Sequence, residues 1–180
     1  EYDKERPESG LSNFAADVIR VQSEKIFGKK MDLAMTNFGG IRTSLPKGAI
    51  RVYDIYSIFP FNNALVYVEI LGSDLLKFFD KLASRNNPEA LSGVKLVVED
   101  RAIKEFLIGG KRIDKNRVYN FATIDFLLEG GDGIQLIDIA QTIHRSETYL
   151  RDAVINHIKE QANGSEPLKL EKDSRVIVKR

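Results

Sequence analysis

Residues 37–42 of this chain read Asn-Phe-Gly-Gly-Ile-Arg, a pattern that could bind an anion. Two adjacent glycines let the backbone turn sharply and expose its N–H groups to a ligand. Arg42, three residues after the first glycine, can present a planar fork of donors to a phosphate or a carboxylate. The same residues would also fit an ordinary turn with an arginine on the surface, so the pattern leaves both interpretations open.

A second cluster, Phe-Pro-Phe-Asn-Asn at 59–63, could bind a flat ring. Proline fixes its own φ and restricts the residue before it, so Phe61 is presented in a defined direction. An aromatic face can stack on a ring whose polar edge meets a neighbouring amide such as that of Asn63. The alternative is that Phe61 is a plain core residue.

The third cluster is Phe126 followed by Gly-Gly-Asp-Gly at 130–133. Glycines around one acidic residue build a tight loop, and the carboxylate of Asp132 could accept two hydrogen bonds from a diol such as that of ribose. A calcium-binding EF-hand loop is excluded because its alternating oxygen ligands and terminal Glu are missing. A simple turn remains the alternative. Together the three clusters supply an anion fork, two aromatics and a diol acceptor, which suits a nucleotide.

Composition removes several other classes of protein. The chain has 180 residues, a net charge of +1, 43% hydrophobic and 29% charged residues, which indicates one globular domain over residues 1–180. Its balanced charge gives no general attraction for nucleic acid or anionic membranes, and no apolar run reaches the ~18 residues of a membrane span. The start without Met suggests a processed or excised product.

Metal and thiol chemistry are not expected in this chain. It contains no Cys and two histidines, His144 and His157, which are too few for a self-contained metal centre unless carboxylates supply most of the ligands. Both histidines are expected to be structural or solvated, and no cofactor is expected to be bound by this chain.

The hydrophobic pattern predicts the elements that must position the clusters. Apolar spacing indicates helices at 9–27, with Ser9 as cap and Gly28 as stop, at 53–58, at 73–84 with Ser73 as cap, and at 147–161. Strands are predicted at 32–36, 65–71, 94–98, 118–123 and 175–178, an extended piece at 49–52, and a two-glycine hairpin at 106–113. Because helices and strands do not alternate strictly, we expect an α+β fold with a mixed sheet and packed helices.

Taken in order, these motifs resemble the C-terminal, substrate-recognition domain of the 5'-nucleotidase family. That family also includes UDP-sugar hydrolases and 2',3'-cyclic nucleotide phosphodiesterases. The resemblance begins with Glu-Ser-Gly-Leu-Ser-Asn-Phe-Ala-Ala-Asp at 8–17, similar to the family's Glu-Ser-x-Leu-Gly-Asn-Leu-x-Ala-Asp helix opening. It continues through 37–42 and 59–63 to 130–133, and therefore covers most of the chain.

The resemblance implies a role for each of six residues. Phe61 and Phe126 would sandwich the base, Asp132 would hold the ribose hydroxyls, Arg42 would grip phosphate, and Asn37 and Asn63 would reach the base or its surroundings. A second phosphate contact would come from Lys4 or Arg6, and the sequence does not decide between them. Base and phosphate preference and oligomeric state are equally open.

In this family a separate metallophosphoesterase domain or chain supplies a pair of divalent metal ions of the Zn or Mn type. This chain alone would therefore bind a nucleotide or nucleoside without cleaving it. The resemblance also implies a location in the periplasm or at the cell surface. Phe38, Ser12 and Ile134 depart from the family pattern. They motivate a second hypothesis, a non-catalytic interaction or scaffold module that keeps the fold around a degenerate pocket.

Overall fold

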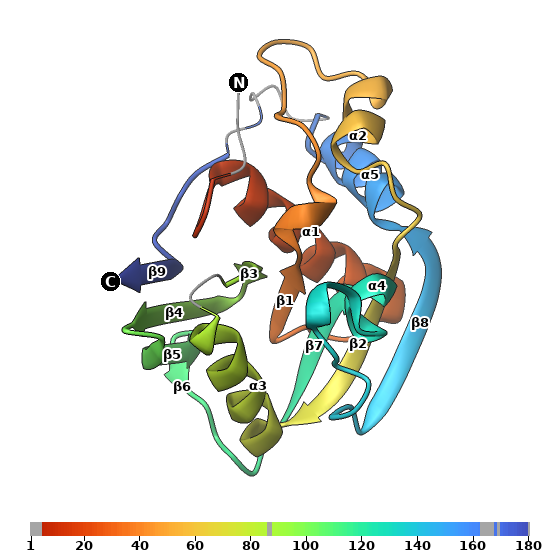
Figure 1. The fold of residues 1–180 in the computed structure, drawn as a ribbon. Coiled ribbons are helices and arrows are strands. Elements are labelled where there is room, and N and C mark those ends of the chain that lie inside the picture. Colours follow the sequence, from red (N-terminus) through yellow and green to blue (C-terminus); the bar gives the residue numbers. More distant parts are fainter. Residues whose placement is uncertain (1–4, 86–87, 163–167, 169, 180) are drawn as a thin grey trace.

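A computed structural model describes residues 5–85, 88–162, 168 and 170–179 (Figure 1). The α-helices of this described part are α1 (Gly10–Phe27), α2 (Val52–Ile58), α3 (Gly72–Ser84), α4 (Asp125–Leu128) and α5 (Leu150–Ala162). The strands are β1 (Leu33–Thr36), β2 (Ala64–Leu71), β3 (Ala90–Ser92), β4 (Val94–Glu99), β5 (Ala102–Ile108), β6 (Lys111–Arg112), β7 (Val118–Ile124), β8 (Thr142–Tyr149) and β9 (Val176–Lys179). Two 3₁₀ turns, η1 (Phe38–Gly40) and η2 (Gly131–Gly133), complete the described elements.

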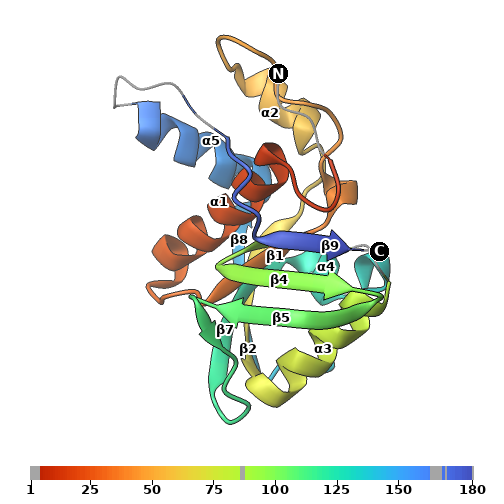
Figure 2. The ribbon, with the colours of Figure 1, turned by 90° about the vertical axis from the view of Figure 1, so that its left-hand side faces the viewer.

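The described strands form two mixed sheets, which confirms the expected α+β class with mixed pairing. The five-stranded sheet has the order β3-β1-β7-β2-β8, in which β1 and β7 are parallel and the other neighbours are antiparallel. The four-stranded sheet has the order β6-β5-β4-β9 and faces the viewer in Figure 2, with β9 parallel to β4. The sequence pattern indicates a mixed sheet, and the structure shows how the strands are divided between two.

Helix α1 begins and ends where its sequence predicts. The Ser9 hydroxyl accepts a hydrogen bond from the Ser12 amide at 3.0 Å, and the Ser12 hydroxyl accepts one from the Ser9 amide at 2.9 Å. These bonds satisfy amides that the first helical turn leaves unpaired. Gly28 ends the helix in the left-handed conformation, with φ of 62°. Ser12, one of the departures from the family pattern, is therefore a helix-capping residue.

Other element boundaries differ from the prediction. Helix α3 begins at Gly72, so its N-cap is Leu71 and not Ser73. Helix α2 already includes Val52, which the sequence pattern assigns to an extended piece. The last helix, α5, begins at Leu150 instead of residue 147, because residues 147–149 continue strand β8, which pairs with β2. Pairing between strands overrides the local helical pattern here.

Strand direction brings the three clusters to one edge of the larger sheet. Because β1 and β7 are parallel, with Leu33 opposite Phe121, the segments that follow them leave the sheet at the same edge. Strand β2 is antiparallel to β7, so the residues that precede it enter at this edge too. Residues 37–42, 61–63 and 125–133 therefore meet.

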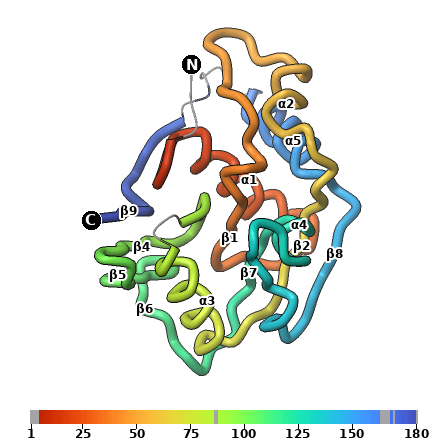
Figure 3. The backbone as a smooth tube through the Cα atoms, in the orientation of Figure 1, coloured from red at the N-terminus to blue at the C-terminus, as the bar shows by residue number. Residues whose placement is uncertain are grey.

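Both sheets share one hydrophobic core. Helix α3 contributes Phe79, whose ring centroid lies 4.3 Å from that of Phe106 on β5 and 6.3 Å from that of Phe121 on β7. Burying an aromatic side chain of this size contributes about 1.5–3 kcal/mol. The backbone trace in Figure 3 shows the segment that leads into β9 passing beside the beginning of α1. Strand β9, the last strand of the described chain, is therefore packed into the same domain as α1.

Candidate functional site

All six residues singled out from the sequence line one cavity of about 230 Å³ at the sheet edge. The lining residues are Asn37, Gly39, Gly40, Arg42, Phe61, Asn63, Phe126 and Asp132. They come from three segments that lie far apart along the chain. The cavity is the place where the three clusters meet, as the strand directions require.

One wall of the cavity is Phe61. Phe59, before Pro60, is 3% exposed, whereas Phe61, after it, is 46% exposed. This excludes the alternative that Phe61 is a core residue. The Arg42 guanidinium carbon lies 5.9 Å from the centroid of the Phe61 ring, so the cationic group and the aromatic face border the same space.

Arg151, near the start of α5, holds this wall from outside the cavity. Its Nη1 donates to the carbonyl oxygens of residues 60 and 61, at 3.3 Å each, and its Nη2 donates to Oδ1 of Asn62 at 2.5 Å. The guanidinium carbon also lies 4.9 Å from the ring centroid of Tyr56 and 5.2 Å from that of Tyr149. The turn that presents Phe61 is thereby fixed to two helices and a strand end.

Phe126 is another part of the lining. In α4 the side chains of Leu127 and Leu128 are buried, while Phe126 is 41% exposed. Its ring lies against the glycine loop, because a Cβ placed on Gly131 would come within 2.4–2.5 Å of three ring atoms. Gly131 is therefore required by close approach of the ring. The run of glycines was visible in the sequence, but this contact was not predictable from it.

Asp132 and Arg42 bring opposite charges to the cavity. Asn37 donates from Nδ2 to Oδ2 of Asp132 at 2.6 Å, and the other carboxylate oxygen accepts no hydrogen bond from any described residue. Arg42 donates to the Gly39 carbonyl oxygen, at 3.4 Å, and forms no ion pair within the described part of the chain. A carboxylate oxygen and most of a guanidinium fork thus remain available to a ligand.

Of the two residues expected to make a second phosphate contact, Arg6 lies away from the cavity lining. Arg6 donates to the Pro88 carbonyl oxygen at 2.9 Å, pairs with Glu89 at 3.4 Å, and lies over the ring of Phe38, 4.4 Å from its centroid. Arg6 is not among the lining residues. Lys4 lies outside the described residues.

The cavity does not fit a divalent metal pair. Among described residues Asp132 is the one acidic side chain in its lining, and the cationic Arg42 lines the same cavity, which disfavours a second cation. In the part of the chain that the structure describes, no three His, Cys, Asp or Glu side chains are grouped as metal ligands would be. His144 stacks on Tyr67 with ring centroids 4.3 Å apart, and His157 packs edge-on against Phe14.

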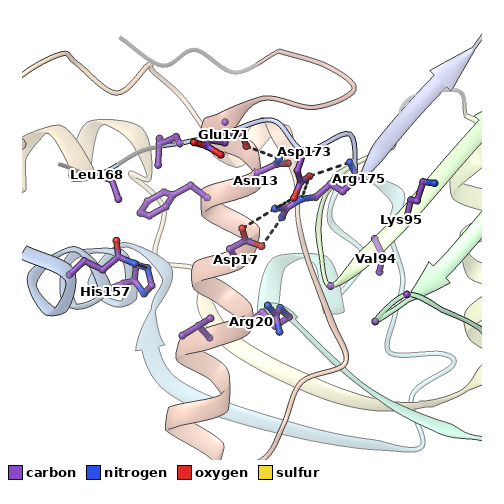
Figure 4. Close-up of a pocket in the computed structure, with 18 residues that line it drawn as sticks. Asn13, Asp17, Arg20, Val94, Lys95, His157, Leu168, Glu171, Asp173 and Arg175 are labelled. Carbon is purple, nitrogen blue, oxygen red and sulfur yellow. Dashed lines mark hydrogen bonds and ion pairs between the residues drawn. The ribbon is translucent and has the colours of Figure 1, made fainter. Parts of the chain in front are cut away.

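A larger cleft of about 750 Å³ lies between α1, α5 and the segment before β9 (Figure 4). Its central group is Arg175, which pairs with Asp17 at 2.6 Å and with Asp173 at 2.8 Å. Burial disfavours the charge of Arg175, but its bonds to Asp173 and Asp17 outweigh burial and raise its pKa. The hydrogen bonds from Arg175 hold the pKa of Asp173 below its ordinary value.

Glu8 holds the same C-terminal segment in place. Its buried carboxylate accepts from the backbone amides of Asp173 at 2.8 Å, Ser174 at 3.1 Å and Val176 at 3.2 Å, and from Nδ2 of Asn13 at 2.8 Å. The acidic residues that open and close the family-like motif at 8–17 therefore anchor the tail. The central charged groups of this cleft, Arg175, Asp17 and Asp173, are thus already paired with one another.

The fold and the small cavity together define an α+β domain with an open ligand site at the edge of a mixed sheet. The family model described as "5'-nucleotidase, C-terminal domain" matches residues 1–139. The chain belongs to this family, as its motifs had indicated.

Relatives of this chain include proteins from several bacteria. "Protein UshA" of Yersinia enterocolitica is 30% identical over 142 residues, covering 77% of this chain and 25% of that protein. "Cell wall protein Lmo0130" of Listeria monocytogenes is 28% identical over 188 residues, covering 96% of this chain and 24% of that protein. The chain thus spans about a quarter of the length of these relatives.

Solved structures share the fold. A 5'-nucleotidase precursor from Thermus thermophilus superposes with a TM-score of 0.82 at 23% identity, over 96% of this chain and 36% of that one. A protein from Staphylococcus aureus, titled a putative 5'-nucleotidase, gives a TM-score of 0.75 at 13% identity, over 99% of this chain and 40% of that one. At these identities the likeness establishes the fold alone.

Proposed function

We propose that this chain is the nucleotide-recognition domain of a 5'-nucleotidase-type phosphohydrolase. The base lies between Phe61 and Phe126, the ribose hydroxyls donate to Asp132, and Arg42 binds the phosphate. Asn37 and Asn63 border the bound base and sugar. The observation that carries the proposal is the content of one cavity. It holds two half-exposed phenyl rings, a carboxylate oxygen that accepts no hydrogen bond from a described residue, and a guanidinium that forms no ion pair with one.

Each of these groups has a distinct energetic part. Stacking of a base on an aromatic ring contributes about 1–3 kcal/mol per contact, so two rings account for much of a micromolar affinity. The carboxylate of Asp132 can accept both hydroxyls of a vicinal diol, while its other contact, from Asn37, fixes its orientation. Arg42 adds a charge-assisted bond that only a phosphorylated ligand can use.

The cavity is an open half-site. Its volume of about 230 Å³ is below the ~300–1,000 Å³ usual for sites that enclose a small molecule. We therefore propose that a metallophosphoesterase domain or a separate chain covers the phosphate end of the ligand. That partner would carry the divalent metal pair, of the Zn or Mn type, which clamps a phosphoryl group and generates the attacking hydroxide. This chain by itself would not hydrolyse the ester.

For location we propose the periplasm or the cell surface. The Listeria relative carries the name of a cell wall protein and covers nearly the whole of this chain. Within the described residues, the helices are too short or too polar to cross a bilayer.

The alternative of a scaffold with a degenerate pocket is less well supported by the geometry. It rests on Phe38, Ser12 and Ile134, which depart from the family pattern. Ser12 caps α1, and the side chains of Phe38 and Ile134 are buried outside the cavity lining. These substitutions leave the lining residues unchanged.

Calorimetric titration of the 180-residue chain with adenosine and with AMP tests the proposal. We expect both to bind, with AMP tighter at low salt because of Arg42. Absence of heat with both ligands, at concentrations that reveal millimolar affinity, would overturn it.

Two substitutions test the division of roles within the site. Arg42→Ala should lower the affinity for AMP about tenfold or more, in a salt-dependent way, and leave the affinity for adenosine nearly unchanged. Phe126→Ala should weaken both ligands alike, because stacking does not sense the phosphate. Arg112→Ala, which removes an equal charge on the β5–β6 hairpin away from the cavity, is the matched control. Equal effects of Arg42→Ala on the two ligands would contradict the assignment.

A further inference from the structure

Arg85 binds the loop that carries Asp132 without lining the ligand cavity. We propose that it is a positioning residue, which holds Asp132 in the conformation that accepts a ribose diol. The inference rests on the proposed function. It adds to the binding site a residue that lies outside the three sequence clusters. Arg85 immediately follows α3, as its C-cap.

The contact is made by both ends of the guanidinium fork. Nη1 of Arg85 donates to the carbonyl oxygen of Asp132 at 3.0 Å, and Nη2 donates to that of Gly133 at 2.6 Å. A Cβ on Gly133 would lie 3.4 Å from Nη2, so the planar group lies close to the loop backbone. Two carbonyl oxygens bound by one rigid fork fix the orientation of consecutive peptide planes.

The loop needs such support because its conformation is costly. Asp132 has φ of 54°, between Gly130 at 105° and Gly133 at 68°. A residue with a side chain loses about 1–2 kcal/mol in this left-handed region, although Asp tolerates it better than most. Neighbouring glycines add further accessible conformations in the absence of contacts. The loop has two backbone hydrogen bonds of its own, from Gly133 to Gly130 and from Ile134 to Gly131, and bonds from Arg85 add support from outside.

Asp132 is consequently held at two points. Arg85 binds its backbone carbonyl oxygen, and Asn37 binds its carboxylate at 2.6 Å. Arg85 does not line the ligand cavity. It borders a different hollow of about 220 Å³ between α3 and the loop. Its contribution to binding must therefore act through Asp132 and not through contact with the ligand.

The Arg85 proposal can be tested with two neutral ligands, adenosine and 2',3'-dideoxyadenosine, which differ in the ribose hydroxyls alone. Calorimetry on the 180-residue chain should show that Arg85→Ala lowers the affinity for adenosine about five- to tenfold. This is the loss expected when one or two hydrogen bonds to the ribose are weakened. The same substitution should weaken the dideoxy analogue less than about twofold, on the same reasoning that the analogue makes no bond to Asp132. Arg85→Lys offers one donor group instead of a fork, and should rescue adenosine affinity only partly.

Two further variants keep the test specific. Lys77→Ala removes an equal charge from the same helix, where Lys77 pairs only with Asp74 among described residues, and should change neither affinity. In an Asp132→Asn background, where the backbone conformation is tolerated, adding Arg85→Ala should change adenosine affinity by less than about twofold. The same cost with and without the Asp132 carboxylate would overturn the inference.

The outcomes also separate this inference from the proposed function. If the unmodified chain binds neither nucleoside, the proposed function itself is wrong. If it prefers adenosine to the dideoxy analogue and Arg85→Ala weakens both equally or neither, the function stands and the role of Arg85 is wrong. Urea unfolding of each variant checks that the chain remains folded.

Discussion

Two hollows of this molecule, the cavity of about 230 Å³ and the cleft of about 750 Å³, differ in what their charged groups already bind. The larger one contains more charged side chains, yet its central cluster of Arg175, Asp17 and Asp173 is already paired within itself. The smaller one contains Arg42 without an ion-pair partner among described residues and a carboxylate oxygen of Asp132 without a donor there. Available groups, and not volume, identify the candidate binding site.

The difference has an energetic basis. A charged group removed from water must be compensated, so a fully paired cluster contributes to folding and offers little to a ligand. Exposed groups that face a common space and lack partners cost the fold little and can bind a ligand of matching chemistry. On this reasoning, substitutions in the cleft should affect stability, and substitutions in the cavity should affect binding.

The largest expected effect is that of Arg175→Ala on stability. It leaves two carboxylates without their partner, and because Asp17 and Asp173 remain 39% and 54% exposed, the cost is below that of a fully buried pair. We expect the free energy of unfolding to fall by about 2–3 kcal/mol, with adenosine affinity unchanged below the unfolding transition. Lys95→Ala, at the rim of the same cleft, is the control for unfolding in urea.

A binding defect without loss of stability is expected for Phe61→Ala. Loss of one stacking contact should weaken adenosine binding by about 1–3 kcal/mol, or roughly 5- to 150-fold. The free energy of unfolding should change by less than about 0.5 kcal/mol, because the ring is already 46% exposed. Tyr53→Ala removes an aromatic ring that is 73% exposed outside the cavity, and should change neither. A similar loss of adenosine affinity in both variants would contradict the comparison.

Gly131→Ala should weaken nucleoside binding without altering any lining residue. The new Cβ would meet the Phe126 ring at 2.4–2.5 Å and displace it from the glycine loop. We expect adenosine affinity to fall by about 1 kcal/mol, toward the lower limit for a lost stacking contact. Gly131 does not lie in the left-handed region, so the contact with the ring, and not backbone strain, is the expected cause. Unchanged calorimetric affinity would show that the Phe126 ring does not bind the base.

The smallest effect concerns the pH dependence of stability in the cleft. Burial lowers the pKa of His157, with smaller effects from the charges of Glu160, Lys25 and Asp17. The unfolded chain, with an ordinary histidine pKa of about 6.5, therefore binds the proton more readily than the folded chain. The folded state therefore has its full stability, as far as His157 is concerned, above pH 6.5. It loses part of that stability as the pH falls from 6.5 toward the lowered pKa of the folded chain. His157→Gln should show a smaller drop in urea stability between about pH 7.5 and 5.5, and an equal drop would refute this.

Several features of the fold could be predicted because they depend on neighbours in the chain. Ser9 and Gly28 bracket α1 as expected, and the glycines at 109 and 110 form the hairpin turn with positive φ. The extent of α5 and the presence of β8 could not be predicted. Residues 147–149 have a pattern compatible with helix, and only their pairing with β2 makes them a strand.

The site divides in the same way. Residue type and local stiffness were sufficient to select Phe61, Phe126 and Asp132, since proline and glycine control the backbone around them. The supporting roles of Arg85 and Arg151 carried no signal in the sequence, because each arginine acts on a loop at least 47 positions away. An arginine on a helix has the same local pattern whether or not its fork reaches a carbonyl oxygen.

The sequence alone determined which side chains could stack on a base, accept hydrogen bonds from a diol or bind an anion, because those properties belong to the residues themselves. The tertiary structure decided that these side chains share one cavity. The parallel pairing of β1 with β7 and the antiparallel pairing of β2 send three distant segments to one sheet edge. Such pairing depends on contacts across the whole chain, and local patterns do not encode it.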